Sequence, residues 1–247
     1  MKEKTKKLVE AFGFLKIDEA QLLMEAADSL ATGSIVVNIG AGVGTSALAI
    51  IEQRPDLAVT FYTVDIRDDD NPFGGMLNEL HAFQNAKMEH LLPNQIKGDS
   101  STVGEKWDKG DISLLVIDAD HTAGGLMKDI QSWLPHLAIG GLVALHDYKR
   151  DVWPDVVAVI DDTLMKDVNY EYIETRGTMV LFRKLKPQPL PKPEPEKESV
   201  YRKADERTAD IKPEQVQKET ATEKNTEKKV NKRSKSAKIT TKEPAEE

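Results

Sequence analysis

The first 186 residues alternate between short, continuous apolar runs, which are typical of buried strands, and apolar residues at helical spacing. Strands are predicted at 34–39, 58–64, 95–97, 112–117 and 142–145, and helices at 18–30 with Asp18 as N-cap, 45–53, 76–88, 122–134 and 155–166. Strands and helices that follow one another in this way predict a parallel sheet covered by helices on both faces.

Two strand-like runs at the end of this region change the picture. Residues 170–174 and 178–183 are separated only by Thr175, Arg176 and Gly177, a link too short for a parallel crossover. They must therefore pair as an antiparallel hairpin. The expected fold is a doubly wound α/β domain over residues 1–186, with a mostly parallel, seven-stranded sheet and an antiparallel C-terminal hairpin strand.

Beyond residue 186 the composition changes. Residues 187–247 begin with a proline-rich stretch and continue with Lys, Glu, Thr, Asn and Ser, and Tyr201 is their single aromatic residue. Such a segment cannot bury enough apolar surface to offset the entropy lost on ordering, so it is predicted to be a disordered, charged tail.

Net charge separates the two parts further. The whole chain carries −8, of which the tail contributes +2 and the first 186 residues −10. An acidic domain argues against broad contact with a phosphate backbone and favours a neutral or cationic small ligand. Residues 228–242 hold seven basic residues and no acidic one. They could bind an acidic partner or nucleic acid, although a solvated tail is the simpler interpretation.

Two absences narrow the class of protein. The chain has no cysteine, which excludes a disulfide framework and a cysteine-based metal site. No apolar run approaches about 18 residues, so no membrane span is predicted, and the N-terminal stretch lacks a signal-peptide cleavage site. A cytoplasmic protein is therefore expected.

Glycines gather between the first strand and the following helix, in the stretch VVNIGAGVGTSALAI. Gly40, Gly42 and Gly44 allow positive φ in the turn and let a ligand lie against the backbone. Their G-x-G-x-G spacing differs from the G-x-G-x-x-G of nicotinamide and flavin sites. A purely structural turn is the alternative.

Polar residues also follow the next two strands. Asp65 ends the second strand, where a carboxylate can accept hydrogen bonds from both hydroxyls of a ribose. An N-capping role is its alternative. Asp99 and Ser100 follow the third strand, where an adenine ring would lie, and capping of a helix by Ser100 or Ser101 is the alternative there.

The fourth and fifth strands each end in carboxylate and imidazole groups. Asp118, Asp120 and His121 follow the fourth strand, and His146 and Asp147 follow the fifth. Ligands of open parallel sheets bind beyond the carboxyl ends of the strands, so chemistry is expected here. Because neighbouring strands lie about 4.8 Å apart, Asp118, His146 and Asp147 can converge on one divalent ion.

Residues 35–183 resemble the class I S-adenosylmethionine-dependent methyltransferases. Within them the chain is most similar to the O-methyltransferase branch that includes the catechol and caffeoyl-CoA enzymes and methyltransferase family 24. The resemblance is carried by the glycine loop, by Asp118-Ala119-Asp120-His121 and by Gly140-Gly141 followed by His146-Asp147. It implies a Rossmann-like fold and S-adenosylmethionine as cofactor.

The resemblance also implies roles for individual residues. Asp118, His146 and Asp147 take the positions of metal ligands, and Asp118 also borders the cofactor. His121 stands where the metal-dependent enzymes keep a lysine near the acceptor oxygen. Asn38 replaces an acid that is frequent in the first strand and would hydrogen-bond the methionine part of the cofactor.

The sequence therefore predicts methyl transfer from S-adenosylmethionine to an oxygen of a small molecule or sugar, assisted by Mg²⁺ or Mn²⁺. A divalent ion would lower the pKa of the acceptor hydroxyl. Without a metal, His121 or His146 would act as general base, and a purely structural network around His146 is a third interpretation. The loop 66–75 is the expected lid over the acceptor.

Two further functions remain open at this point. A nicotinamide-dependent oxidoreductase is disfavoured by the glycine spacing and by the terminal hairpin. A non-catalytic, methyltransferase-like binding module would bind the cofactor without transferring its methyl group.

Overall fold

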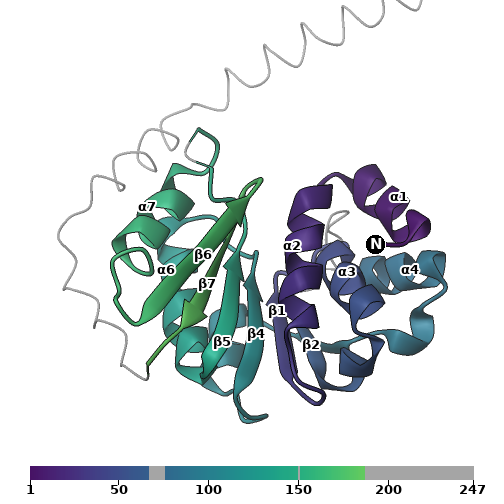
Figure 1. Cartoon of the computed structure of the whole chain (residues 1–247), viewed down its shortest axis with the longest axis horizontal. Helices are drawn as coiled ribbons and strands as arrows, with labels where there is room; N and C mark the ends of the chain where they lie inside the picture. Colours follow the sequence, from purple (N-terminus) through teal and green to yellow (C-terminus); the bar gives the residue numbers. More distant parts are fainter. Residues whose placement is uncertain (67–75, 150, 187–247) are drawn as a thin grey trace, which may run out of the picture. The chain divides into compact units, whose positions relative to one another are not determined.

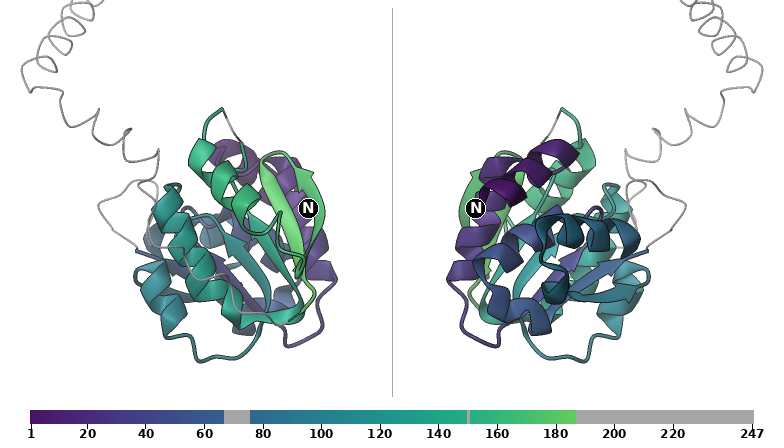
Figure 2. Two further views of the ribbon diagram at one scale, coloured as in Figure 1. Left: turned by 90° about the vertical axis from the view of Figure 1, so that its left-hand side faces the viewer. Right: turned by 90° about the vertical axis from the view of Figure 1, so that its right-hand side faces the viewer.

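The computed structural model describes residues 1–66, 76–149 and 151–186. They form a seven-stranded sheet in the order β3-β2-β1-β4-β5-β7-β6, with helices on both sides of it (Figures 1 and 2). The strands are β1 Ile35–Ile39, β2 Phe61–Asp65, β3 Asn94–Lys97, β4 Ile112–Ile117, β5 Leu137–Leu145, β6 Tyr170–Arg176 and β7 Met179–Lys184. The α-helices are α1 Glu3–Phe12, α2 Ile17–Asp28, α3 Thr45–Gln53, α4 Met76–Ala86, α5 Ser100–Glu105, α6 Ala123–Trp133 and α7 Pro154–Asp162.

The central strands are apolar on both sides because helices cover both faces of the sheet. Val36 belongs to a buried cluster that includes residues of α2 and α3. Its neighbour Val37 points the other way, into a second cluster with α6 and α7. Side chains alternate along a strand, so a continuous apolar run is what burial on both faces requires.

The terminal hairpin confirms the predicted topology. β7 pairs antiparallel with both β5 and β6, whereas β1, β2, β3, β4 and β5 are joined by parallel pairing. Gly177 allows the turn between β6 and β7, with φ of 58°. The predicted α/β fold with one reversed strand near the sheet edge is therefore confirmed.

Several predicted boundaries were wrong for local reasons. The second strand was expected from position 58, but a 3₁₀ helix, Pro55–Thr60, precedes β2. The fifth strand was expected to begin after its two glycines, whereas β5 already begins at Leu137 and contains them. Helix α2 is capped at Lys16 and not at Asp18, because the backbone N–H of Lys16 donates to Glu19 Oε2 at 2.8 Å.

Two helices were not predicted at all. Helix α1 is mostly polar, and only two of its residues, Thr5 and Val9, are buried. Helix α5 has only six residues, too few for a helical period. The 3₁₀ helices Glu89–Leu91 and Leu134–His136 complete the described elements.

The predicted tail at 187–247 and most of the predicted lid, 67–75, lie outside the described residues. Within the described part of the chain, no helix has both the length and the apolarity that crossing a membrane requires.

Candidate active site

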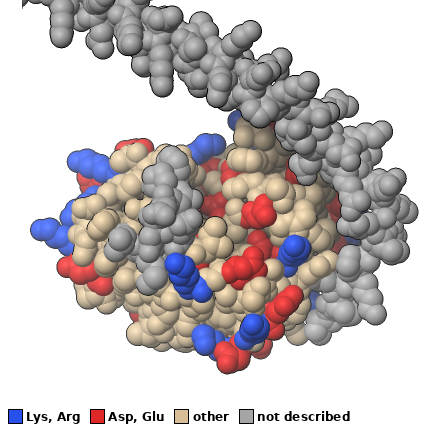
Figure 3. Space-filling model, turned by 180° about the vertical axis from the view of Figure 1, so that it is seen from behind, with Lys and Arg blue, Asp and Glu red and all other residues tan. Residues whose placement is uncertain are grey.

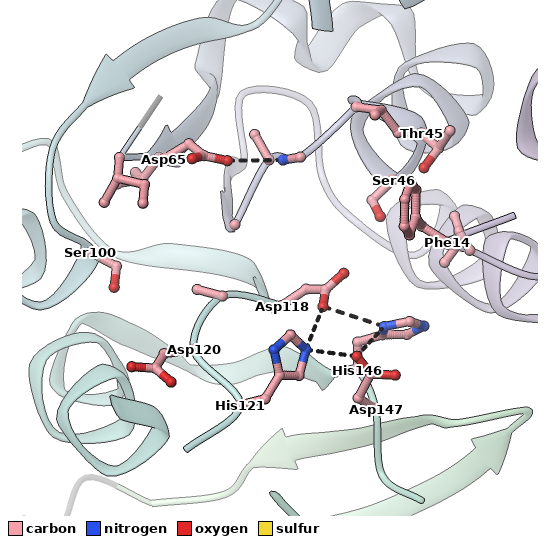
Figure 4. Close-up of a pocket in the computed structure, with 18 of the residues that line it drawn as sticks. Phe14, Thr45, Ser46, Asp65, Ser100, Asp118, Asp120, His121, His146 and Asp147 are labelled. Carbon is pink, nitrogen blue, oxygen red and sulfur yellow. Dashed lines mark hydrogen bonds and ion pairs between the residues drawn. The ribbon is translucent and has the colours of Figure 1, made fainter. Parts of the chain in front are cut away.

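A cavity of about 800 Å³ opens beyond the carboxyl ends of β1, β2, β4 and β5. Figure 4 shows its walls. Its lining includes Gly40, Gly42, Asp65, Asp99, Ser100, Asp118, Asp120, His121, His146 and Asp147, together with Phe14, Leu15, Thr45, Ser46 and Trp153. The sheet edge that the sequence predicted to carry chemistry is therefore where the cavity lies.

The glycine loop lies directly against the end of β4. Gly40 has φ of 78°, and a Cβ there would come within 1.8 Å of the carbonyl oxygen of Asp118. The backbone N–H of Gly42 donates to Asp65 Oδ2 at 2.9 Å. Gly44, with φ of 83°, is the N-cap of α3. The loop and the carboxylate of Asp65 thus form one connected wall of the cavity.

The residues after β3 have roles within the fold as well as places on the cavity wall. Asp99 caps α5, since it accepts hydrogen bonds from the Thr102 backbone N–H at 2.9 Å and the Ser101 hydroxyl at 2.7 Å. The hydroxyl of Ser100 donates to Asp129. Capping by Ser100 or Ser101 was the alternative interpretation, and the structure assigns the cap to Asp99.

Asn38 does not reach the cavity. Its side chain is 1% exposed, and neither of its amide atoms has a hydrogen-bond partner among the described residues. Position 38 shares a face of β1 with Val36, which packs toward α2 and α3. Alternation along the strand turns the side chain under the helices, and binding of the cofactor by Asn38 stays a prediction.

Two carboxylates and two imidazoles meet at the ends of β4 and β5 (Figure 4). His146 Nδ1 lies 3.3 Å from Asp118 Oδ1 and 3.5 Å from Asp147 Oδ2. His121 Nε2 lies 2.7 Å from Asp147 Oδ2 and 3.8 Å from Asp118 Oδ1. Asp118, His121 and Asp147 also offer ligand atoms that all lie within 4.8 Å of one another. The predicted cluster forms, and His121 is closer to it than the sequence indicated.

Each group in this cluster alters the pKa of its neighbours. Asp118 and Asp147 raise the pKa of His121 to about 9. Burial opposes the charge on His146, but the surrounding carboxylates outweigh it and raise its pKa far above the ordinary value. Burial likewise opposes ionisation of Asp118 and Asp147, and the imidazoles overcome it and lower both pKa values. At neutral pH the four groups are therefore all charged when no further cation is bound.

Two residues that the sequence did not predict complete the cluster. Glu19, at the start of α2, accepts a hydrogen bond from His146 Nε2 at 3.1 Å. The ring of Trp153 stacks on His121, with centroids 4.3 Å apart. Glu19 lies 127 positions from His146, and its sequence context marks only the first turn of a helix. No local pattern could have assigned it to the site.

The described lining of the cavity contains five aspartates and neither Lys nor Arg. Several acidic side chains also gather near the middle of the face drawn in Figure 3. The excess of carboxylates agrees with the negative net charge of the first 186 residues. It disfavours the binding of an anionic ligand in the cavity.

Residues 37–148 match the family model of a methyltransferase domain. The predicted methyltransferase is thereby confirmed. The match begins in β1 and ends one residue after Asp147, so it contains the glycine loop and the acid and imidazole cluster of this methyltransferase domain. Glu19 and Trp153 lie outside the matched residues.

Solved structures of other methyltransferases share the fold. The SAH-bound methyltransferase PaMTH1 of Podospora anserina is 14% identical, over 75% of this chain and 89% of that one, with a TM-score of 0.56. The O-methyltransferase NovP is 13% identical over 69% and 81%, with a TM-score of 0.56. MycE from the mycinamycin biosynthetic pathway, solved with Mg and SAH, is 16% identical over 76% and 56%, with a TM-score of 0.51. These likenesses show a shared fold.

Proposed function

We propose that this methyltransferase moves the methyl group of S-adenosylmethionine to a hydroxyl oxygen of a small molecule or sugar, assisted by Mg²⁺ or Mn²⁺. The observation that carries the proposal is the meeting of Asp118, His121, His146 and Asp147 on a cavity wall beside the glycine loop. A donor on the loop and an acceptor at the cluster would lie close enough to react, and orientation of this kind contributes about 7–11 kcal/mol to catalysis.

The donor side is argued from the glycine loop and Asp65. Backbone groups of Gly40 and Gly42 line the cavity, as does the carboxylate of Asp65. The methionine part would lie over the loop, the ribose on Asp65, and the adenine near Asp99 and Ser100. A volume of about 800 Å³ is in the upper part of the range for small-molecule sites. It can hold the donor together with a small acceptor.

The residues present fit a divalent ion. His146 Nδ1 is buried and faces Asp118 Oδ1 at 3.3 Å and Asp147 Oδ2 at 3.5 Å. Two carboxylates and one imidazole are ligands that Mn²⁺ and Mg²⁺ accept. When bound there, the ion would lower the pKa of the acceptor hydroxyl and so supply a nucleophilic oxygen at neutral pH.

His121 and Trp153 border the place proposed for the acceptor. Stacking on Trp153 and the short contact with Asp147 fix the orientation of the His121 ring. When its ring is protonated, His121 can donate a hydrogen bond that orients the acceptor oxygen. The acidic lining favours an acceptor without negative charge.

The metal-free alternative assigns proton transfer to His121 or His146. In the absence of an added cation, both pKa values are raised, that of His121 to about 9. An imidazole that is already protonated at neutral pH cannot accept the acceptor's proton. The same contacts therefore weigh against a general-base mechanism at neutral pH.

The test compares Asp118→Ala with the native protein across a panel of phenols and sugars. We expect the rate of methyl transfer to fall at least about 100-fold. S-adenosylhomocysteine binding, measured by calorimetry, should weaken far less, because the ion serves the acceptor. Asp151→Ala is the matched control, since Asp151 is exposed and pairs only with Lys149 among the described residues.

Chelation extends the test. We expect excess chelator to stop transfer by the native protein and added Mn²⁺ or Mg²⁺ to restore it, whereas Asp118→Ala should not respond. Full activity in chelator, combined with loss in His121→Ala or His146→Ala, would establish the general-base mechanism instead. Cofactor binding without transfer to any acceptor would favour a non-catalytic module.

A further inference from the structure

The buried carboxylate of Glu19 makes contacts that ordinary packing does not require. The side chain is 1% exposed and lies on α2, outside the residues that match the methyltransferase family. Its Oε2 accepts hydrogen bonds from the Lys16 backbone N–H at 2.8 Å and from His146 Nε2 at 3.1 Å. Its Oε1 accepts from the backbone N–H and the hydroxyl of Thr178, at 2.7 and 2.9 Å.

Four donors therefore hold this carboxylate in one orientation. Two of them come from the turn between β6 and β7, where a Cβ on Gly177 would lie 2.3 Å from Glu19 Oε1. Because both oxygens are occupied, Glu19 can only accept from His146 Nε2. The Nε2 proton is thereby fixed, and Nδ1 is the nitrogen that faces Asp118 and Asp147.

An unprotonated Nδ1 facing two carboxylate oxygens is unfavourable unless a positive charge lies between them. A proton can provide that charge, and so can a bound cation. A carboxylate on the far nitrogen of a ligating histidine is a recurring arrangement, because it fixes the tautomer and makes the ring a better ligand.

We infer that Glu19 is a positioning residue, which holds the His146 ring so that Nδ1 is presented to a divalent ion shared with Asp118 and Asp147. The inference rests on the proposed function, since it concerns the same ion. It adds to the site a residue from helix α2 and, through Thr178, a contact from the terminal hairpin.

The first experiment measures Mn²⁺ affinity of the full chain by calorimetry. We expect Glu19→Gln to weaken binding by about 10–100-fold, the usual effect of losing such a partner. Glu25→Gln is the matched control, because it removes a carboxylate of the same helix that pairs with Arg176 at 2.5 Å. It should bind Mn²⁺ as the native protein does.

A double variant separates positioning from general damage to the fold. If Glu19 acts through His146, the Glu19→Gln/His146→Ala protein should bind Mn²⁺ as well as His146→Ala alone. Losses that simply add, or a folded Glu19→Gln protein with native affinity, would overturn the inference.

The second experiment observes the His146 ring by ¹⁵N nuclear magnetic resonance and does not depend on activity. With Mg²⁺ bound, the native ring should carry its proton on Nε2, in slow exchange with water, and Glu19→Gln should speed that exchange. The opposite tautomer in the native protein would overturn the inference even if Glu19→Gln failed to fold. The native protein could bind no Mn²⁺ and still keep a slowly exchanging Nε2 proton that depends on Glu19. That result would overturn the proposed ion site and show that Glu19 only orients the ring.

Discussion

At the scale of single residues, the site combines groups predicted by their position at strand ends with groups brought in by packing. Asp65 ends β2, and Asp118, His146 and Asp147 directly follow β4 and β5, so the parallel sheet brings them to one edge. Glu19 reaches the same edge only because α2 packs beside the terminal hairpin. Burial and hydrogen bonding then fix the charge of each group.

Asp65→Ala should weaken cofactor binding by roughly 1–3 kcal/mol, because the ribose hydroxyls would lose a charged acceptor. The same change removes the bond from Gly42. Asp65→Asn keeps a hydrogen-bond acceptor without the charge, so its affinity for the cofactor should lie between those of the native protein and Asp65→Ala. Calorimetry with S-adenosylhomocysteine measures the effect, and unchanged affinity in Asp65→Ala would remove this residue from the site.

Asp129 gives a prediction about the pH dependence of stability. Burial raises its pKa to about 6, and the nearby carboxylates of Asp120 and Asp99 add to the shift. A carboxyl group whose folded pKa is raised stabilises the protein most at low pH, and this contribution is lost as pH rises toward and through 6. Relative to Asp129→Asn, the native protein should lose up to about 3 kcal/mol between pH 4 and pH 7.

Urea unfolding of both proteins across this range measures the difference. Comparison with Asp129→Asn cancels the titration of other groups, because those groups are common to both proteins. A stability difference that stays constant with pH would show that Asp129 ionises normally in the folded state.

At the scale of elements, the turn from β1 to α3 both packs against the end of β4 and lines the proposed donor site. Gly40 and Gly33 both have positive φ, of 78° and 82°, but only Gly40 faces a neighbouring strand closely. Gly33→Ala should lower the free energy of unfolding only by the conformational strain at this position, about 1–2 kcal/mol. Gly40→Ala must also displace the backbone of Asp118, so it should lower the free energy of unfolding by roughly 2–5 kcal/mol in all.

Denaturant unfolding of the two variants, followed by S-adenosylhomocysteine titration, checks this expectation. Gly33→Ala is the matched control, since no atom lies within 4 Å of its added Cβ. Equal costs in the two variants would mean that the contact with β4 is not tight in solution.

At the scale of the whole molecule, the described residues contain the complete sheet and both apolar clusters. Deletion of 187–247 should therefore leave the melting temperature and the affinity for S-adenosylhomocysteine unchanged, because that segment lacks the apolar residues needed for packing. Thermal unfolding and calorimetry of residues 1–186 test this. A melting temperature several degrees lower would place the domain boundary further along the chain.

The sequence by itself determined the order of the strands and of five of the helices, α2, α3, α4, α6 and α7. It also determined the reversed terminal strand, the glycine turn and the acids and imidazoles at the ends of β4 and β5. These features follow from local periodicity, from a link of three residues, and from the rule that parallel strands end at a common edge. Short helices and exact boundaries, such as α5 and the start of β5, depend on capping and on strand register, which a local pattern does not contain.

Only the tertiary structure decided what each polar side chain contacts. It buried Asn38 beneath the helices, made Asp99 the cap of α5, and stacked Trp153 on His121. It also brought Glu19 to His146 across 127 positions. Contacts between segments so far apart arise when separate elements pack on the sheet, so the protonation, orientation and ligand-binding capacity of the predicted residues are properties of the folded chain.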